Sequence, residues 1–364
     1  MSFFRPNLDR MHGYAPGEQP QEGGWIKLNT NENPYPPSPR VIEALEKRIR
    51  GRLNVYPDPL ATEFRKLVAA RFNVEPDWVL PANGSDENLT LILRCFIDPG
   101  EKVISPYPSY ILYETLAELQ GGSFARLVLK PDWSWDRAEA TKLIEAAKLA
   151  IIPNPNSPSG NRWSDEEVLS LIPPKGLLVL DEAYGDFADK PHRGELLHGA
   201  QGNRLIVTRT LSKSFSLAGI RLGFAIAHPD LIAGMRKMKD SYNCDALALA
   251  AGTAALEDWE WMESNRAKII ATRKRLTEAL RKQGFAVMES QANFVWCQHP
   301  QHCAKEIYEE LKRRKILVRL MGFNGAHWPD AKDELHPVTG LRITIGTDAE
   351  TDGLIRGLGE ILAD

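Results

Sequence analysis

TLSKSFSLAGIRLG, residues 210–223, places one lysine, Lys213, among small and hydroxylated residues, and one cation, Arg221, eight residues later. A lysine with the ordinary pKa of about 10.4 is protonated at pH 7, and a protonated amine cannot attack a carbonyl carbon. Lys213 could therefore form a covalent bond to a carbonyl carbon only at a site that favours its neutral form. One such site would bind a carbonyl cofactor with a phosphate group, which Ser212 could hold through its hydroxyl and Arg221 through its guanidinium fork. The alternative is a surface lysine in a serine-rich turn, which is the commoner case for an isolated S-K-S.

LLVLDEAYGDF, residues 177–187, predicts a buried strand that ends on Asp181. Open α/β sheets bind their ligands at the carboxyl ends of parallel strands. At such a place Asp181 could pair with a protonated pyridine nitrogen, and Tyr184 could donate to a phenolate oxygen on the same ring. Taken alone, Asp181 could also be a helix cap that follows a strand.

The D-E-A-Y of residues 181–184 and the T-L-S-K-x-F-x-L-A-G-x-R-x-G of residues 210–223 resemble two motifs of the fold-type I, pyridoxal-phosphate-dependent aminotransferases of classes I and II. The resemblance runs from about residue 14 to the end of the chain, and the histidinol-phosphate aminotransferases are the most similar members. It implies that pyridoxal 5'-phosphate is bound at Lys213. The implied reaction is ping-pong amino transfer from histidinol phosphate to 2-oxoglutarate, which gives imidazole acetol phosphate and glutamate in histidine biosynthesis.

The resemblance also implies roles for residues along the whole chain. Lys213, Asp181 and Tyr184 are the implied catalytic residues. The implied contacts with the cofactor come from Tyr56, which would reach the cofactor of a neighbouring subunit, and from Gly84, Ser85, Asp86, Tyr110, Ser157, Asp181, Tyr184, Ser212, Lys213 and Arg221. The implied contacts with the substrate come from Tyr14, Asn31, Arg319 and Arg342. Ser157 departs from the family pattern, because many members have an asparagine there.

Two of these expectations also rest on the residues themselves. The turn at residues 83–86 precedes a predicted helix, and a helix N-terminus offers unpaired N–H groups and a positive dipole end to a phosphate. Arg342 offers a guanidinium fork, which binds a carboxylate or a phosphate at two points. Alternatively, residues 83–86 form an ordinary turn before a helix, and Arg342 forms an ion pair on the surface. Residues 320–340 form a longer loop than is usual in the family, so the identity of the substrate is least defined there.

The order strand, turn, helix recurs from residue 79 to 207, which predicts a mainly parallel sheet flanked by helices. Strands predicted at residues 285–290, 292–298, 315–320 and 341–347 belong to a smaller region. The predicted fold class is therefore α/β, with a large domain around that sheet and a smaller α+β C-terminal domain. The expected division is an N-terminal arm at 1–40, a cofactor-binding domain at 41–255 and a small domain at 256–364. One helix is expected to begin at a Thr62 cap, and another at a capping box of Ser164 and Glu167.

Composition agrees with a small-molecule enzyme. A chain of 364 residues that is 43% hydrophobic can bury a large core and is too long for one ordinary domain. Its net charge of -3 provides no field that would attract nucleic acid or an anionic membrane. The four cysteines are too sparse for a disulfide scaffold, and the N-terminus lacks the apolar run of a signal peptide. These features predict a cytoplasmic protein that acts on small molecules. The resemblance implies a homodimer whose partners are a small amino donor and a keto acid.

Other functions find less support in the sequence. The C-x-H-x-x-H-C of residues 297–303 has zinc-ligand residue types but lacks widely separated pairs, so no metal is expected. Nucleotide binding is disfavoured because neither G-x-G-x-x-G nor G-x-x-x-x-G-K-[ST] occurs. The remaining alternatives keep the same cofactor residues. They are an aromatic amino-acid aminotransferase, a decarboxylase similar to threonine-phosphate decarboxylase, and a non-catalytic pyridoxal-binding module.

Overall fold

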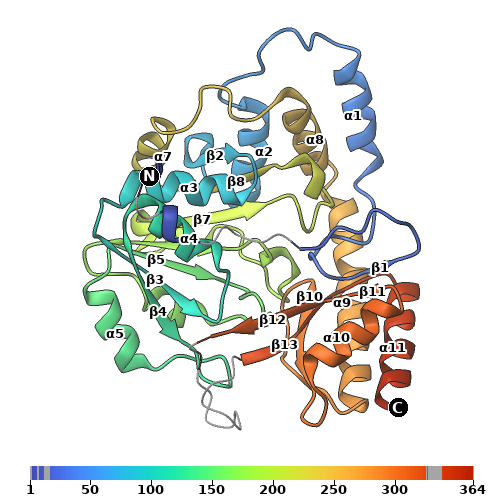
Figure 1. Ribbon diagram of the computed structural model, residues 1–364. Coiled ribbons are helices and arrows are strands. Elements are labelled where there is room, and N and C mark those ends of the chain that lie inside the picture. Colours follow the sequence, from blue (N-terminus) through green and yellow to red (C-terminus); the bar gives the residue numbers. More distant parts are fainter. Residues whose placement is uncertain (1, 6–7, 12–16, 325, 327–337, 364) are drawn as a thin grey trace.

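The computed structural model describes residues 2–5, 8–11, 17–324, 326 and 338–363. Its largest element is a seven-stranded sheet, which fills the centre of the molecule (Figure 1). In spatial order the strands are β2 (Val79–Ala82), β8 (Gly223–Ala227), β7 (Leu205–Thr210), β6 (Leu177–Asp181), β5 (Leu149–Pro153), β3 (Lys102–Tyr107) and β4 (Ser123–Val128). The neighbours from β7 to β4 run parallel, whereas β8 is antiparallel to both β2 and β7.

Both faces of this sheet are covered, which explains why its strands read as nearly continuous apolar runs. Side chains alternate between the faces: in β6, Leu178 and Leu180 join one hydrophobic cluster and Val179 joins the other. One face packs against α3 (Ser85–Phe96), α4 (Leu112–Gln120) and α7 (Pro229–Arg236). The other packs against α2 (Thr62–Phe72), α5 (Arg137–Glu145), α6 (Asp165–Leu169) and α8 (Ala246–Glu257), with α1 (Pro39–Ile49) lying on α8.

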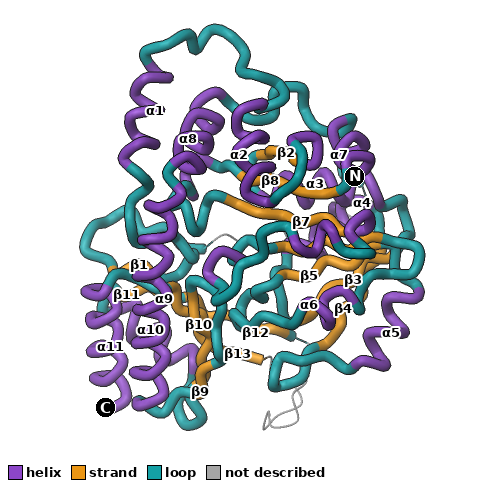
Figure 2. Tube along the Cα trace, turned by 180° about the vertical axis from the view of Figure 1, so that it is seen from behind, coloured by secondary structure: helices purple, strands orange, loops and turns teal. Residues whose placement is uncertain are grey.

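A second, smaller sheet has the antiparallel order β12-β13-β10-β9. Its strands are β12 (Arg319–Phe323), β13 (Val338–Thr344), β10 (Phe294–Gln298) and β9 (Ala286–Val287). A separate hydrophobic cluster joins it to α9 (Trp259–Lys282), α10 (Ala304–Arg313) and α11 (Asp348–Ala363). Seen from both sides, α9 runs from the region of α8 down beside α10 and α11 (Figures 1 and 2). The predicted fold class, a mainly parallel α/β sheet with a smaller α+β region, is confirmed.

The N-terminal segment contributes to the C-terminal region. Strand β1 (Ile26–Lys27) pairs in parallel with β11 (Ile316–Leu317) in a two-stranded sheet of its own. The prediction of one strand at residues 315–320 was therefore wrong, because the chain leaves β11 and enters β12 of the four-stranded sheet at Arg319.

Two predicted helix starts had different outcomes. The capping box of Ser164 and Glu167 at the start of α6 is confirmed. The Thr62 cap was wrong, because Thr62 is the first helical residue of α2 and the N-cap position is Ala61. The carboxylate of Asp58 caps this helix from outside, accepting hydrogen bonds from the backbone N–H groups of Thr62 at 2.7 Å and Leu60 at 2.9 Å.

Candidate active site

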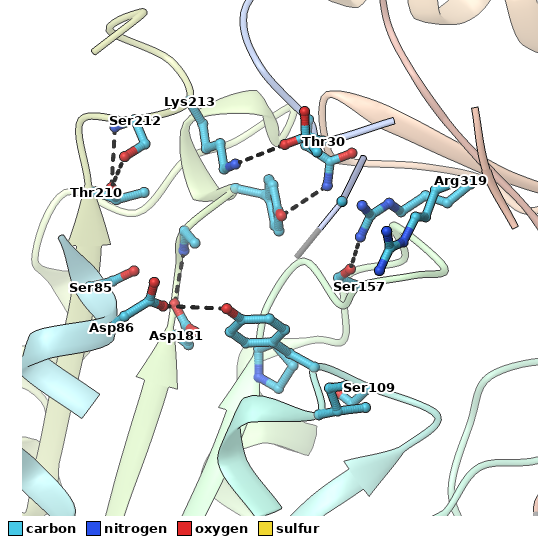
Figure 3. A pocket seen from close by; sticks show the side chains of 18 of the residues that line it. Thr30, Ser85, Asp86, Ser109, Ser157, Asp181, Thr210, Ser212, Lys213 and Arg319 are labelled. Atoms are coloured by element: carbon cyan, nitrogen blue, oxygen red, sulfur yellow. Dashed lines mark hydrogen bonds between the residues drawn. The ribbon is translucent and has the colours of Figure 1, made fainter. Parts of the chain in front are cut away.

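A cavity of about 390 Å³ lies where the carboxyl ends of β5, β6 and β7 face the small sheet. Pro153, Asp181 and Thr210, each the last residue of its strand, line it, as do Arg319 and Arg342 of the small sheet. In Figure 3, Ser85 and Asp86 at the start of a helix lie on one side of the cavity, and Ser157 and Arg319 lie on the other. The large sheet therefore places its ligand site at the edge that open α/β sheets use.

Lys213 enters this cavity from the turn that follows β7. Its Nζ donates to the backbone oxygen of Thr30 at 3.3 Å, and the two residues point toward one another in Figure 3. Burial is the main cause that lowers the pKa of Lys213 to about 8; the positive charges of Arg342 and Arg221 also lower this pKa, whereas the carboxylates of Glu32 and Asp86 raise it. The amine is therefore partly neutral at a pH where an ordinary lysine is a cation.

Asp181 is buried at the end of β6, where three donors meet its carboxylate. The hydroxyl of Tyr113 donates to Oδ2 at 2.7 Å, and the hydroxyl of Thr208 and the backbone N–H of Ala183 each donate to Oδ1 at 3.1 Å. Burial raises the pKa of Asp181 to about 6, although these hydrogen bonds favour the ionised form. At neutral pH the carboxylate can therefore still receive a cationic N–H from the cavity.

An anion-binding arrangement lies beside Lys213. Helix α3 begins here, and its N-cap, Gly84, has φ +80 and provides no side chain to cap the first N–H groups. The guanidinium of Arg221 lies over this position, 3.5 Å from the carboxylate of Asp86, and donates to the hydroxyl of Ser212 at 3.2 Å. A Cβ on Gly84 would stand 2.7 Å from Arg221 Nη2, so only glycine allows the guanidinium to come this close. Backbone N–H groups, a hydroxyl and a guanidinium are the donors that a phosphate needs.

Two tyrosines predicted to hold a ring line the same cavity. The hydroxyl of Tyr184 accepts a hydrogen bond from Asn31 Nδ2 at 2.9 Å, and burial raises its pKa. Tyr110 directs its hydroxyl toward Asp86 at 3.5 Å, and its ring meets that of Tyr113 edge-on, with centroids 5.5 Å apart. Asn31 was predicted from the resemblance as a substrate contact; in the structure its amide donates to the hydroxyl of Tyr184.

The wall opposite the helix α3 N-terminus carries two arginines. Arg319 and Arg342 are cross-strand partners in β12 and β13, and both line the cavity. Arg342 donates to the hydroxyl of Ser157 at 3.1 Å and to the backbone oxygen of Asn29 at 3.1 Å. Ser157, expected at the cofactor, thus contacts the residue expected at the substrate. Two adjacent guanidinium groups make this wall suited to an anion.

The remaining predicted site residues are Tyr56 and Tyr14. Tyr56 does not line the cavity of its own chain; it is 75% exposed and its ring stacks on Tyr242 with centroids 4.2 Å apart. Tyr14, a predicted substrate contact, lies outside the described residues.

Sequence reasoning missed several residues of the site, above all the two hydroxyl donors to Asp181. Thr208 was detectable, because strand alternation puts it on the same face as Thr210. Tyr113 had no such signal, since its contact depends on how α4 packs. Asn29, Thr30, Ser109 and Thr210 also line the cavity.

Behind the site lies a buried ion cluster that sequence reasoning also missed. Arg209 donates to Glu182 Oε2 at 2.8 Å and to Asp186 Oδ1 at 2.7 Å, and His192 bonds the other oxygen of Glu182. Burial would raise the pKa of Glu182, but Arg209 and His192 hold it at about 2. Asp186 also accepts from the hydroxyl of Ser214 at 2.6 Å, next to Lys213 in the chain.

Among the described residues, no group of three or more histidine, cysteine, aspartate or glutamate side chains could hold a metal ion. Every helix in the described ranges is too short or too polar to cross a bilayer.

Comparisons with known proteins agree with this geometry. The family model of class I and II aminotransferases matches residues 23–358. A histidinol-phosphate aminotransferase of Rhodopirellula baltica is 47% identical over 352 residues, which cover 96% of this chain and 93% of the relative. A histidinol-phosphate aminotransferase of Nostoc sp. is 41% identical, with 99% and 98% covered.

A solved structure gives the same result. The histidinol-phosphate aminotransferase of Sinorhizobium meliloti, in complex with pyridoxal-5'-phosphate, superposes with a TM-score of 0.86 at 25% identity and covers 100% of this chain and 98% of that chain. The family match spans most of the sequence, and it agrees with the lysine, the carboxylate and the anion-binding donors gathered in one cavity. The chain belongs to the family of class I and II aminotransferases.

Proposed function

We propose that this protein binds pyridoxal 5'-phosphate at Lys213 and transfers an amino group from histidinol phosphate to 2-oxoglutarate. One observation carries the proposal: Lys213, Asp181 and the donors around Gly84 share a single cavity, whose opposite wall holds Arg319 and Arg342. The relatives that are 40–47% identical over nearly the whole chain carry the name histidinol-phosphate aminotransferase, which supports this choice of substrate.

The residues present fit this cofactor. Ser212, Arg221 and the first N–H groups of α3 would hold its phosphate, and the space beside Gly84 is one that any larger residue would fill. Asp181 would face the ring nitrogen, and Lys213 would bond to the aldehyde carbon. When bound, pyridoxal phosphate supplies that aldehyde and a ring that takes up the electron pair released at the substrate carbon.

The protein's own groups then have separate tasks. Lys213, with its pKa near 8, can release and take up a proton close to neutral pH. Its Nζ is therefore suited to transfer the proton to and from the substrate carbon that bears the amine. Asp181 remains ionised through its three donors and can keep a ring N–H protonated. Arg342, aimed by Ser157 and the backbone of Asn29, orients the anionic end of the substrate, with Arg319 beside it.

We also propose a homodimer with shared sites. Tyr56 is exposed, as are Leu53, Val55 and Leu60 of the same segment, and its ring stacks on the exposed Tyr242. Exposed apolar side chains grouped in this way are typical of an interaction site. In the dimer Tyr56 would reach the phosphate of the neighbouring subunit's cofactor. A cytoplasmic location and the division at residues 255 and 256, close to the start of α9, belong to the same proposal.

The test uses the absorbance of the purified holoenzyme and the products formed from 2-oxoglutarate. We expect a visible cofactor band in the wild type that changes on addition of histidinol phosphate, with glutamate formed, and no such band in Lys213→Ala. A band that responds to phenylalanine alone would favour an aromatic amino-acid aminotransferase. Release of carbon dioxide from threonine phosphate, without glutamate, would favour the decarboxylase. A wild type that lacks the band would contradict the assignment of Lys213.

A further inference from the structure

The backbone that carries Lys213 is held from outside the cavity by one side chain of the N-terminal segment. Asn33 Nδ2 donates to the backbone oxygen of Lys213 at 3.0 Å and to that of Ser214 at 3.2 Å. Its own Oδ1 accepts from the N–H of Tyr35 at 3.0 Å, which fixes the orientation of the amide. Asn33 is half-buried and does not line the cavity.

The same turn is also anchored in the buried ion cluster. The hydroxyl of Ser214 donates to Asp186 at 2.6 Å, and Asp186 is held in turn by Arg209. Ser216, where the turn bends back, has φ +60 and donates its N–H to the oxygen of Lys213 at 3.4 Å. Asn33 therefore binds the peptide oxygens of Lys213 and Ser214, and Asp186 binds the side chain of Ser214 in the same turn.

The segment that carries Asn33 is itself fastened to the small sheet. The N–H of Asn31 donates to Thr344 Oγ1 at 2.9 Å, and Asn293 Nδ2 donates to the oxygen of Asn31 at 3.0 Å. Within the same segment, the oxygen of Asn29 accepts from Arg342 and that of Thr30 accepts from Lys213. Residues 29–33 thus connect Arg342, on the cavity wall of the small sheet, to both the backbone and the amine of Lys213.

We propose that Asn33 is a positioning residue that fixes the peptide groups of Lys213 and Ser214 and so aims the Lys213 amine into the cavity. The inference rests on the proposed covalent role of Lys213. A reacting group displaced by about 1 Å can lose on the order of a hundredfold in rate, so two hydrogen bonds to its backbone are sufficient to affect catalysis.

The test compares Asn33→Ala with a matched variant, Asn265→Ala. Asn265 is buried on α9 and donates its amide to the backbone oxygen of Pro36 at 3.4 Å, so it anchors the same segment but makes no hydrogen bond to the Lys213 turn. Two quantities are measured on each protein: kcat and KM with histidinol phosphate and 2-oxoglutarate, normalised to bound cofactor, and the rate at which cofactor-free protein takes up pyridoxal phosphate, followed by absorbance.

For Asn33→Ala we expect kcat to fall by about 10- to 100-fold with both KM values changed less than about threefold, and the uptake rate to fall similarly. Asn265→Ala should keep both rates within about threefold of wild type. The proposal is overturned if Asn33→Ala keeps the wild-type uptake rate, or loses no more than Asn265→Ala. If the wild type does not react with histidinol phosphate, the proposed substrate is wrong, but the uptake rates still test the role of Asn33. If the wild type takes up no pyridoxal phosphate, the proposed function and the proposed role of Asn33 are both overturned.

Discussion

Lys213 obtains its chemistry from its surroundings. Its side chain is withdrawn from water and lies near Arg342 and Arg221, and both effects favour the neutral amine. Two carboxylates, Glu32 and Asp86, act in the opposite direction, so the pKa settles near 8. The residue is therefore poised to exchange a proton near neutral pH, which an exposed lysine cannot do.

The first prediction concerns the titration of this amine. The folded pKa of about 8 lies below the ordinary 10.5, so between these two values the unfolded chain binds more protons than the native protein. This group therefore makes the cofactor-free protein more stable as the pH rises from 8 to 10.5, and its amine becomes reactive above about pH 8. Acylation of Lys213 by acetic anhydride, followed by mass spectrometry from pH 6 to 11, should show a midpoint near 8.

The control for this titration is Arg342→Gln. Removing the cation should move the midpoint for Lys213 to higher pH, because Arg342 is the charge that most lowers its pKa after burial itself. A wild-type midpoint near 10 would show that the amine is solvated and would contradict the electrostatic account.

At the scale of single elements, helix α3 depends on the glycine at its N-cap. Gly84 has φ +80, and its missing Cβ makes room for the guanidinium of Arg221. A substitution there adds two separate costs, backbone strain and displacement of the arginine. A second glycine, Gly100, has φ +87 but nothing within 4 Å of the position of a Cβ, so it carries the strain alone.

We therefore predict different outcomes for Gly84→Ala and Gly100→Ala. Both should lose about 1–3 kcal/mol of unfolding free energy from the positive φ. Gly84→Ala alone should also bind pyridoxal phosphate at least about tenfold more weakly, since a charge-assisted hydrogen bond contributes about 1.5–3 kcal/mol. Denaturant unfolding and cofactor titration measure the two effects. Equal cofactor affinity in both variants would show that Arg221 does not need the space at Gly84.

Strands β6 and β7 present different chemistry on their two faces. Asp181 lines the cavity and accepts from Thr208, while Glu182, directly after β6, and Arg209 of β7 lie in the buried cluster behind it. Because the pKa of Glu182 is held at about 2, below the usual 4.5, its share of stability is complete above pH 4.5 and is lost as the pH falls toward 2.

Arg209→Met should accordingly destabilise the protein by about 3–5 kcal/mol, because it leaves the carboxylates of Glu182 and Asp186 buried without their main cation. The matched variant is Arg275→Met, which removes an arginine bonded to Asp348 and Asp352 with its side chain 41% exposed. That change should cost less than about 1 kcal/mol. Similar shifts of the unfolding midpoint in the two variants would contradict the role of burial.

At the scale of the whole molecule, the position of Tyr56 bears on assembly. In the single chain this ring lies on the surface beside Tyr242 and does not line the cavity of that chain. If sites are shared, one subunit supplies Lys213 and the other supplies Tyr56 to each site. Hybrid dimers can therefore separate the two contributions.

The last prediction is that Lys213→Ala and Tyr56→Ala proteins, each weak in cofactor binding or activity, complement one another when mixed after brief unfolding and refolding. Each hybrid would contain one site with both residues intact and one site lacking both. Activity at limiting pyridoxal phosphate should rise well above the mean of the two parents. Activity equal to that mean would mean that Tyr56 serves no neighbouring site, and mixing without refolding controls for exchange of subunits.

Much of the fold could be predicted because its signals are local. The apolar run at residues 177–181 predicted β6, and the spacing of Ser164 and Glu167 predicted the start of α6. Periodicity and capping depend on neighbours within a turn or two of the chain, so they can be read without coordinates. The Thr62 cap failed because Thr62 is the first helical residue of α2, and its own N–H donates to the carboxylate of Asp58.

The sequence by itself determined the family, the lysine, the carboxylate and the residues around them, because each lies in a short motif. Tertiary structure alone decided which distant groups meet those residues. The hydroxyl of Tyr113 on Asp181, the amide of Asn33 on Lys213, and the pairing of Arg319 with Arg342 depend on helix packing and strand register. Such contacts join segments that are up to 180 residues apart, and no local pattern encodes them. For the same reason the lowered pKa of Lys213 is a property of the folded cavity, since burial and the charge of Arg342 arise only there.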